Sequence, residues 1–135
     1  MISIEKEIKV QFFDCDPMGV VWNGKYFDYF EMVRADLLAK YDLSYMKIAD
    51  KGYQLPLVKN KIKYIKPLPA DSVFKIKATV TEYEIMLKIK YEITDLKTGI
   101  ITTKGESTQA ATDLQGNSVG HIPDFIIDKI KKDDN

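Results

Sequence analysis

The chain has 135 residues and a mass of 15.5 kDa, a size typical of a single domain, and we expect residues 1–135 to form one. Twenty Lys and Arg balance twenty Asp and Glu, which argues against a nucleic-acid-binding protein because such proteins carry a basic excess. A single Cys and a single His exclude an internal disulfide framework and a zinc site built from these ligands. Catalysis, if present, is expected to use carboxylates.

The N-terminal segment is polar and predicts neither a signal peptide nor a membrane anchor. Acidic residues occur within the first seven positions, and no apolar run approaches the roughly 20 residues that cross a bilayer. We therefore expect a cytoplasmic protein without a membrane span. Apolar and polar residues then alternate, which predicts a first strand over residues 6–13.

One long helix is predicted in the first third of the chain. Apolar residues recur every three or four positions, at Phe27, Phe30, Val33, Leu37 and Tyr41. Asn23 is a suitable N-cap residue, and Glu31 is spaced to pair with Arg34 on the helix surface. Because aromatic residues also occupy positions 26 and 29, we expect the helix to be largely enclosed.

The remaining sequence predicts strands followed by a short helix. Alternating or β-branched residues indicate strands over 53–65, 72–83, 86–95 and 100–112. Pro56 breaks the first of these or places it at a sheet edge or bulge, and the second and third have so short a connection that they form a hairpin. With a last helix over 123–132, the pattern predicts an α+β fold: about five antiparallel strands wrapped around one central helix.

The segment from Phe12 to Tyr26 is the unusual part of the sequence. Asp14 and Asp16 end an apolar strand and precede Pro17 and a glycine, so an ordinary turn is one interpretation. The apolar run that follows, Met-Gly-Val-Val-Trp, needs burial and favours a covered site instead. Asp16 is then expected near the start of the long helix.

This pairing of a carboxylate with a helix start suits acyl transfer. The first helical turn offers free N–H groups and a partial positive charge, which bind a carbonyl oxygen that becomes negative. A carboxylate opposite can attack the carbonyl carbon or take a proton from an attacking water. A thioester is a suitable substrate because thiolate leaves without a strong general acid.

Two motifs resemble a known family. The run Asp14-Cys15-Asp16-Pro17 and Gly19-Val20-Val21-Trp22, continuing through Tyr26 and Glu31, resembles the signature of the 4-hydroxybenzoyl-CoA thioesterase-like branch of the hotdog-fold family. A looser resemblance follows in Lys63-Tyr64-Ile65-Lys66-Pro67 and Asp71. The resemblance implies a hotdog fold and an acyl-CoA thioesterase that uses no metal or organic cofactor.

The resemblance also implies roles for individual residues. Asp16 is expected as catalytic nucleophile or general base, and the backbone N–H of Asn23 as the donor that polarises the thioester carbonyl. Asp14 matches a position at which the family's residue usually has a structural role. Substrate contacts are expected at Gly19, Val20, Trp22, Tyr26 and Lys63. Cys15 lies between two carboxylates, which raises the pKa of its thiol and indicates a structural residue.

Departures from the family pattern leave the acyl group and its carrier open. Many relatives have His where this chain has Asn23, and Asn where it has Lys25. Acidic and apolar residues, Glu84 to Met86, occupy a turn where some relatives place cations against the CoA nucleotide. The alternatives are therefore an acyl-CoA thioesterase, an enzyme acting on acyl carrier protein, and a non-catalytic module that binds either thioester.

Two further features bear on partners and on other catalytic groups. The lysines between Lys59 and Lys66 form either a solvated strand face or a contact for phosphates or an acidic carrier. His121 is interpreted as a loop residue. The family resemblance implies a homodimer or homotetramer with active sites shared between subunits.

Overall fold

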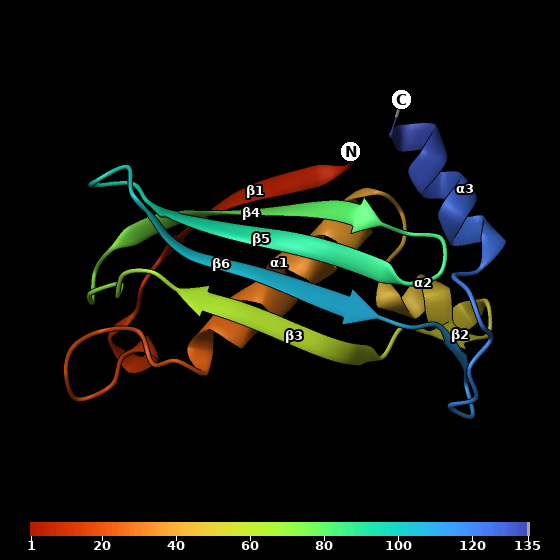
Figure 1. The fold of residues 1–135 in the computed structure, drawn as a ribbon, viewed down its shortest axis with the longest axis horizontal. Helices are drawn as coiled ribbons and strands as arrows, with labels where there is room; N and C mark the ends of the chain where they lie inside the picture. The colour runs from red at the N-terminus through yellow and green to blue at the C-terminus, as the bar shows by residue number, and fades with distance from the viewer. Residues whose placement is uncertain (135) are drawn as a thin grey trace.

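The computed structural model describes residues 1–134 and contains one five-stranded antiparallel sheet with a long helix across one face (Figure 1). The strand order is β1-β4-β5-β6-β3. The strands are β1 (Ser3–Lys9), β3 (Leu57–Tyr64), β4 (Val73–Glu82), β5 (Leu87–Asp95) and β6 (Ile101–Gln109). The helix is α1 (Lys25–Lys40). This arrangement agrees with the predicted α+β fold.

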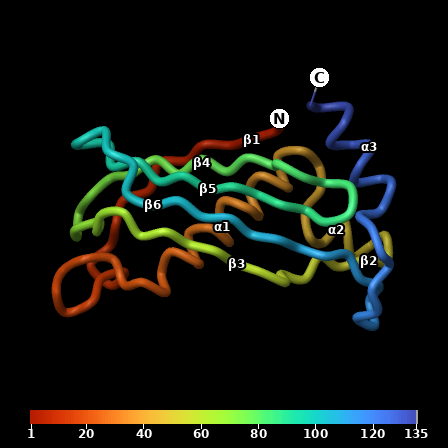
Figure 2. Tube along the Cα trace, viewed as in Figure 1, coloured from red at the N-terminus to blue at the C-terminus, as the bar shows by residue number. Residues whose placement is uncertain are grey.

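Shorter elements close the two ends of the molecule. A 3-10 turn, η1 (Phe12–Asp14), follows β1, and α2 (Tyr45–Asp50) follows α1. Two short strands, β2 (Tyr53–Gln54) and β7 (Thr112–Asp113), pair beside α2, and α3 (Asp124–Asp133) ends the described chain. Figure 2 shows the two ends of the chain close together, where the N-terminal ammonium lies 2.8 Å from the Asp134 carboxylate.

The core lies between α1 and the inner face of the sheet. The alternating residues of β4 and β5 that face the helix are buried: Phe74, Ile76, Ala78, Val80, Leu87, Ile89, Tyr91 and Ile93. The Phe30 ring of α1 stacks on Tyr91 with centroids 4.3 Å apart. Gly105 of β6 allows this close approach, because a Cβ there would lie 2.5 Å from the Phe30 ring.

The structure corrects three local expectations. The first strand ends at Lys9, and the predicted positions 12 and 13 belong to η1, where both Phe side chains are exposed. Helix α2 was not predicted because six residues give too short a periodic pattern. Helix α1 is covered on one side only, so the expectation that it is largely enclosed is wrong: Asp28, Glu31, Met32, Ala39 and Lys40 are exposed.

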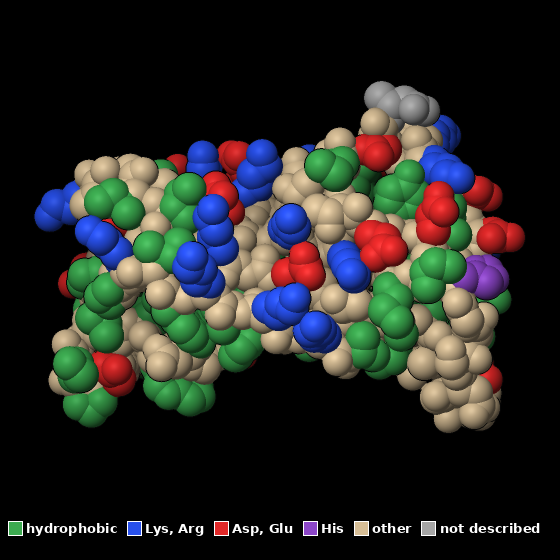
Figure 3. All heavy atoms as spheres, in the orientation of Figure 1, with side chains coloured by type: hydrophobic (Ala, Val, Ile, Leu, Met, Phe, Trp, Pro, Cys, Tyr) green, Lys and Arg blue, Asp and Glu red, His purple; other side chains and the backbone are tan. Residues whose placement is uncertain are grey.

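Strand β3 is an edge strand with a free side. Its predicted break at Pro56 and its edge position are confirmed, and its register shifts between Leu57 and Lys59. The outer face of the sheet carries charged side chains, most of them lysines (Figure 3). A hollow of about 780 Å³ on this face, the basic hollow, is lined by charged residues that include Lys61, Lys63, Lys77, Lys90, Glu92, Lys104 and Glu106.

Candidate active site

The segment between η1 and α1 forms a tight hairpin, which we call the Asp16 hairpin (residues 14–22). Its two arms are joined where Cys15 bridges Val21, and the Asp16 N–H donates to the Val20 carbonyl at 2.9 Å. Gly19 forms the tip with φ of +79°, a conformation that favours glycine because it has no Cβ. The Asp, Pro and Gly of the sequence therefore do make a turn, but one whose arms are buried in part.

The hairpin is docked against the connection between β3 and β4. The Val21 N–H donates to the Leu68 carbonyl at 2.8 Å, and the Ala70 N–H donates to the Gly19 carbonyl at 2.9 Å. Leu68 is fully buried, so this connection provides a fixed surface for the hairpin. Two segments that lie about 50 residues apart in the sequence are thereby held together at one end of the sheet.

Asp16 lies half-buried on the first arm of the hairpin. One carboxylate oxygen, Oδ1, accepts a hydrogen bond from the Met18 N–H at 2.9 Å. Among residues 1–134, no other hydrogen-bond donor or cation is found for this carboxylate. Asp16 therefore keeps lone pairs free for a substrate or a water molecule.

Asn23 directly follows the second arm of the hairpin and precedes Gly24, the N-cap residue of α1. Its carbonyl accepts a hydrogen bond from the Tyr64 hydroxyl at 3.0 Å. Within the part of the chain that the structure describes, the N–H groups of Asn23 and Gly24 have no acceptor. These free donors belong to the positive end of the helix dipole, where a developing oxyanion is stabilised.

The helix begins one residue later than predicted. Gly24 is the N-cap residue, and no side chain among residues 1–134 caps the helix, so the expected capping by Asn23 is wrong. The Trp22 indole covers Gly24 so closely that a Cβ at position 24 would lie 2.3 Å from the ring. A larger residue at position 24 would therefore require the Trp22 indole to move.

A small cavity of about 170 Å³ borders Asn23, whereas Asp16 is not among its lining residues. It is lined by Val20, Val21, Asn23, Tyr26, Tyr64, Ile65, Lys66 and Pro67. Three of the residues expected from the sequence, Val20, Asn23 and Tyr26, thus share one cavity. The cavity also includes Tyr64 and Lys66 from the second motif. Lys66 belongs to the lysine cluster for which a phosphate or carrier contact was one interpretation, whereas Tyr64 was given no role.

The other expected substrate residues lie elsewhere. Gly19 forms the hairpin tip, and the Trp22 side chain is 59% exposed. Lys63 lines the basic hollow on the outer face of the sheet and not the small cavity. His121 lies in the loop before α3, where its Nδ1 contacts the Ile122 carbonyl at 2.7 Å.

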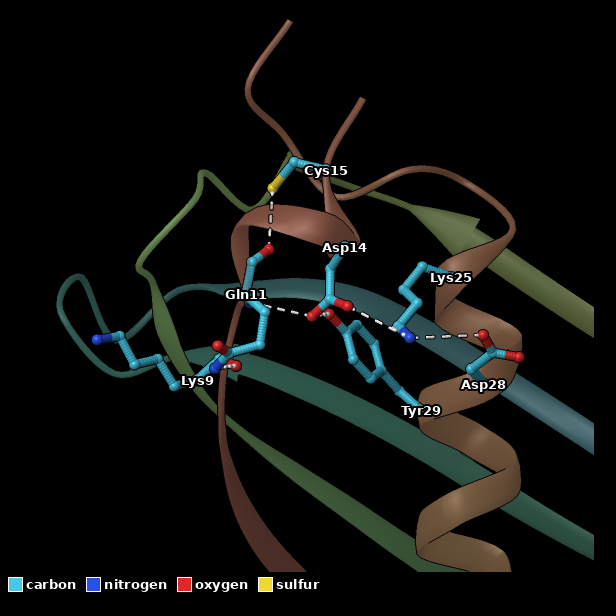
Figure 4. Close-up of polar contacts among 7 residues, drawn as sticks. All are labelled: Lys9, Gln11, Asp14, Cys15, Lys25, Asp28 and Tyr29. Atoms are coloured by element: carbon cyan, nitrogen blue, oxygen red, sulfur yellow. Dashed lines mark hydrogen bonds and ion pairs between the residues drawn. The ribbon is translucent and has the colours of Figure 1, made fainter. Parts of the chain in front are cut away.

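Asp14 is the buried carboxylate that ties the hairpin to α1 (Figure 4). Its Oδ2 accepts hydrogen bonds from the Gln11 N–H at 3.0 Å and the Tyr29 hydroxyl at 2.9 Å. The Lys25 ammonium lies 3.3 Å from Oδ1. Burial raises the pKa of Asp14, but these donors and the Lys25 charge outweigh it, so the pKa lies below its ordinary value.

Cys15 does not have the environment of a catalytic thiol. Burial, followed by the charges of Asp14, Asp16 and Asp71, raises the pKa of its thiol, in agreement with the prediction. Its Sγ lies 3.6 Å from the Gln11 carbonyl. The thiol is therefore kept protonated within the hairpin.

Comparison with known proteins identifies the family. The sequence profile of the thioesterase-like superfamily matches residues 10–130 of this chain. The chain belongs to the thioesterase-like superfamily. The match includes the Asp16 hairpin, α1 and the sheet, so the expected thioesterase class is confirmed at the level of the family.

Relatives of this superfamily member carry names of the same kind. A putative esterase of Aquifex aeolicus is 35% identical over 74 residues, which cover 55% of this chain and 58% of the relative, so the match spans little more than half of that protein. The DHNA-CoA thioesterase from Staphylococcus aureus is similar in structure, with a TM-score of 0.86, 25% identity, and coverage of 99% of this chain and 92% of that chain.

A third comparison concerns the branch that the motifs suggested. A variant of 4-hydroxybenzoyl-CoA thioesterase complexed with 4-hydroxybenzoyl-CoA superposes with a TM-score of 0.84 at 16% identity, covering 96% of this chain and 99% of that chain. The predicted hotdog fold is confirmed. Within residues 1–134, no helix of this superfamily member is both long and apolar enough to span a bilayer.

Proposed function

We propose that the protein hydrolyses an acyl-CoA thioester to a carboxylic acid and free CoA at the Asp16 hairpin. One observation carries the proposal: a carboxylate with free lone pairs lies on the first arm of the hairpin, and the second arm leads directly into a free backbone N–H that borders a small cavity. The thioester carbonyl oxygen would accept from the Asn23 N–H, and its carbon would face Asp16. The partial positive charge of α1 would then stabilise the tetrahedral oxyanion.

Two chemical routes are compatible with this arrangement. In the first, an Asp16 oxygen attacks the carbonyl carbon, the C–S bond breaks, and the resulting mixed anhydride is opened by water. In the second, Asp16 takes a proton from a water whose oxygen attacks the carbonyl, and the same C–S bond breaks. Both routes consume one water and release one acid and one thiol, and neither requires imidazole or a thiol from the protein.

The names of the relatives support CoA as the carrier, since two of the structural neighbours are thioesterases of CoA esters. The alternative is a module that binds an acyl thioester or an acyl carrier protein without turnover. One reason for it was that Lys25 stands where many relatives have Asn. Lys25 has a partner in Asp14, which gives it a role within the hairpin that is independent of the carrier. We therefore favour catalysis on acyl-CoA.

We further propose that a second copy of the chain completes the site, in a homodimer or homotetramer. A cavity of about 170 Å³ is small for an acyl thioester, and pockets for such ligands usually exceed 300 Å³. On η1 and the Asp16 hairpin, large apolar side chains are exposed in the described chain, at 88% for Phe12, 80% for Phe13 and 85% for Met18. The free edge of β3 offers a row of unpaired backbone groups nearby.

The test is thiol release from a panel of acyl-CoA esters with short, long and aromatic acyl groups. Wild type, Asp16→Asn and the control Asp50→Asn, which changes an exposed carboxylate of α2, are compared at equal folded concentration. We expect turnover by wild type and control and a large loss in Asp16→Asn. Tight binding without hydrolysis on every member would favour the non-catalytic module, and an active Asp16→Asn would refute the assigned role.

A further inference from the structure

We infer that Lys25 and Tyr29 are positioning residues that act through Asp14 to fix the spacing between the Asp16 carboxylate and the Asn23 N–H. The inference rests on the proposed function and extends it to two residues that neither the sequence motifs nor the family match assigns. It follows from the way in which one buried carboxylate joins α1 to both arms of the hairpin.

The side chain of Asp14 makes the connection to the helix. Lys25 and Tyr29 are four residues apart, so their side chains project from the same face of α1 over consecutive turns. Figure 4 shows both side chains directed at Asp14, from which the hairpin continues to Cys15. Oδ2 has two donors and Oδ1 has the ammonium, so the carboxylate is held in one orientation.

The main chain of Asp14 makes the connection to both arms of the hairpin. Its carbonyl accepts a hydrogen bond from the Trp22 N–H at 3.0 Å, and Trp22 directly precedes Asn23 on the second arm. Asp16 lies two residues after Asp14 on the first arm. A shift of Asp14 therefore disturbs both the arm that carries the carboxylate and the arm that leads to the oxyanion donor.

The environment makes the Lys25 contact more than an ordinary surface ion pair. The Asp14 side chain is 4% exposed, so its charge has little solvent to replace a lost cation. Exposed ion pairs contribute little to stability. The second ion pair of Lys25, with the exposed Asp28 at 3.6 Å, is such a pair. Removal of Lys25 leaves a buried negative charge with two neutral donors, which favours movement of the hairpin toward solvent.

The experiment compares variants of the two residues with matched controls at the C-terminal end of α1. Lys25→Met removes the charge, Lys25→Arg keeps it, and Tyr29→Phe removes the hydroxyl. Lys40→Met and Tyr41→Phe serve as controls, because the polar ends of these side chains contact the Ser3 carbonyl, at 3.4 and 3.5 Å, at the opposite end of α1 from the hairpin. For each protein, kcat and KM are measured together with hydrogen exchange of residues 14–24 and of the central strand, residues 87–95.

A positioning role for Lys25 and Tyr29 predicts a loss of kcat together with faster hydrogen exchange in the hairpin alone. A displacement of 1 Å can cost a rate about 100-fold, so Lys25→Met and Tyr29→Phe should lower kcat by about 10- to 100-fold while KM changes less than about threefold. Lys25→Arg should restore kcat to within about threefold of wild type. Exchange should accelerate in residues 14–24 of the two impaired variants, not in residues 87–95, and the controls should match wild type.

Three results would overturn the inference. They are an unchanged kcat in Lys25→Met, no rescue by Lys25→Arg, or an equal acceleration of exchange in residues 87–95, which would indicate a general loss of stability. Failure of the proposed function gives a different result, since wild type itself would then release no thiol. In that case the exchange of residues 14–24 would still show whether Lys25 holds the hairpin.

Discussion

Gly105→Ala tests the contact that sets the distance between α1 and the sheet. In a strand, replacement of Gly by Ala ordinarily stabilises a protein by roughly 0.5–1 kcal/mol. Here the new Cβ would lie 2.5 and 2.6 Å from two Phe30 ring atoms and 3.1 Å from the Lys61 carbonyl oxygen. The ring would have to move by about 1 Å to reach an ordinary contact of about 3.5 Å. Tyr91, stacked on the Phe30 ring with centroids 4.3 Å apart, restricts this movement.

The expected cost is therefore that of an overpacked core, about 1–3 kcal/mol. With an unfolding entropy of about 2.1 cal/mol/K per residue, the 135 residues have about 0.28 kcal/mol/K, so the melting temperature should fall by about 4–11 °C. Thermal unfolding followed by circular dichroism measures the shift. In a Phe30→Leu background the cost of Gly105→Ala should shrink by at least about 1 kcal/mol. A rise in stability, or the same cost in both backgrounds, would refute this account of the packing.

Three more predictions concern the hairpin. Gly19→Ala should lower the free energy of unfolding in urea by about 1–2 kcal/mol, because alanine is strained at a φ of +79°. No described atom lies within 4 Å of the new Cβ, so the cost comes from the backbone alone, and an unchanged midpoint would contradict it. Folding lowers the pKa of Asp14 from its ordinary value of 3.8. The ionised Asp14 therefore stabilises the fold fully at pH values above 3.8, and this contribution is lost as the pH falls through the lowered pKa. Acid unfolding of Asp14→Asn should therefore show a shallower loss of stability below pH 3.8 than wild type, whereas parallel curves would exclude the effect. Cys15, with a raised pKa, should react with a disulfide reagent at pH 8 at least about 10-fold more slowly than glutathione, and labelling at the glutathione rate would count against its environment.

Alternation predicted the central strands from the sequence because these strands have one buried face. The inward residues of β4 and β5 are all apolar, and the expected ranges 72–83 and 86–95 agree with Val73–Glu82 and Leu87–Asp95 within one or two residues. The same rule extended the first strand too far. Phe12 and Phe13 continue an apolar pattern, but they are exposed in this chain, so the pattern there does not report burial in a strand.

The sequence predicted which residues form the candidate site, but it did not predict the contacts that hold them in place. Asp16 and Asn23 follow from the motif and from the helix start, both of which are local in sequence. The link from Lys25 to Asp14 crosses eleven residues and depends on the path of the hairpin, and the contact of Tyr64 with Asn23 joins segments 41 residues apart. Such contacts are set by tertiary packing, which the periodicity of a single sequence does not specify.

The comparison of Asp16→Asn with Asp50→Asn on the best acyl-CoA substrate tests the central claim most directly. Asn keeps the shape of the side chain and its hydrogen bond from Met18, but it can neither attack a thioester nor accept a proton from water. We predict that kcat falls at least about 100-fold in Asp16→Asn, while Asp50→Asn stays within about twofold of wild type and both variants unfold like wild type. An Asp16→Asn protein that releases thiol at more than about one third of the wild-type rate would contradict the account.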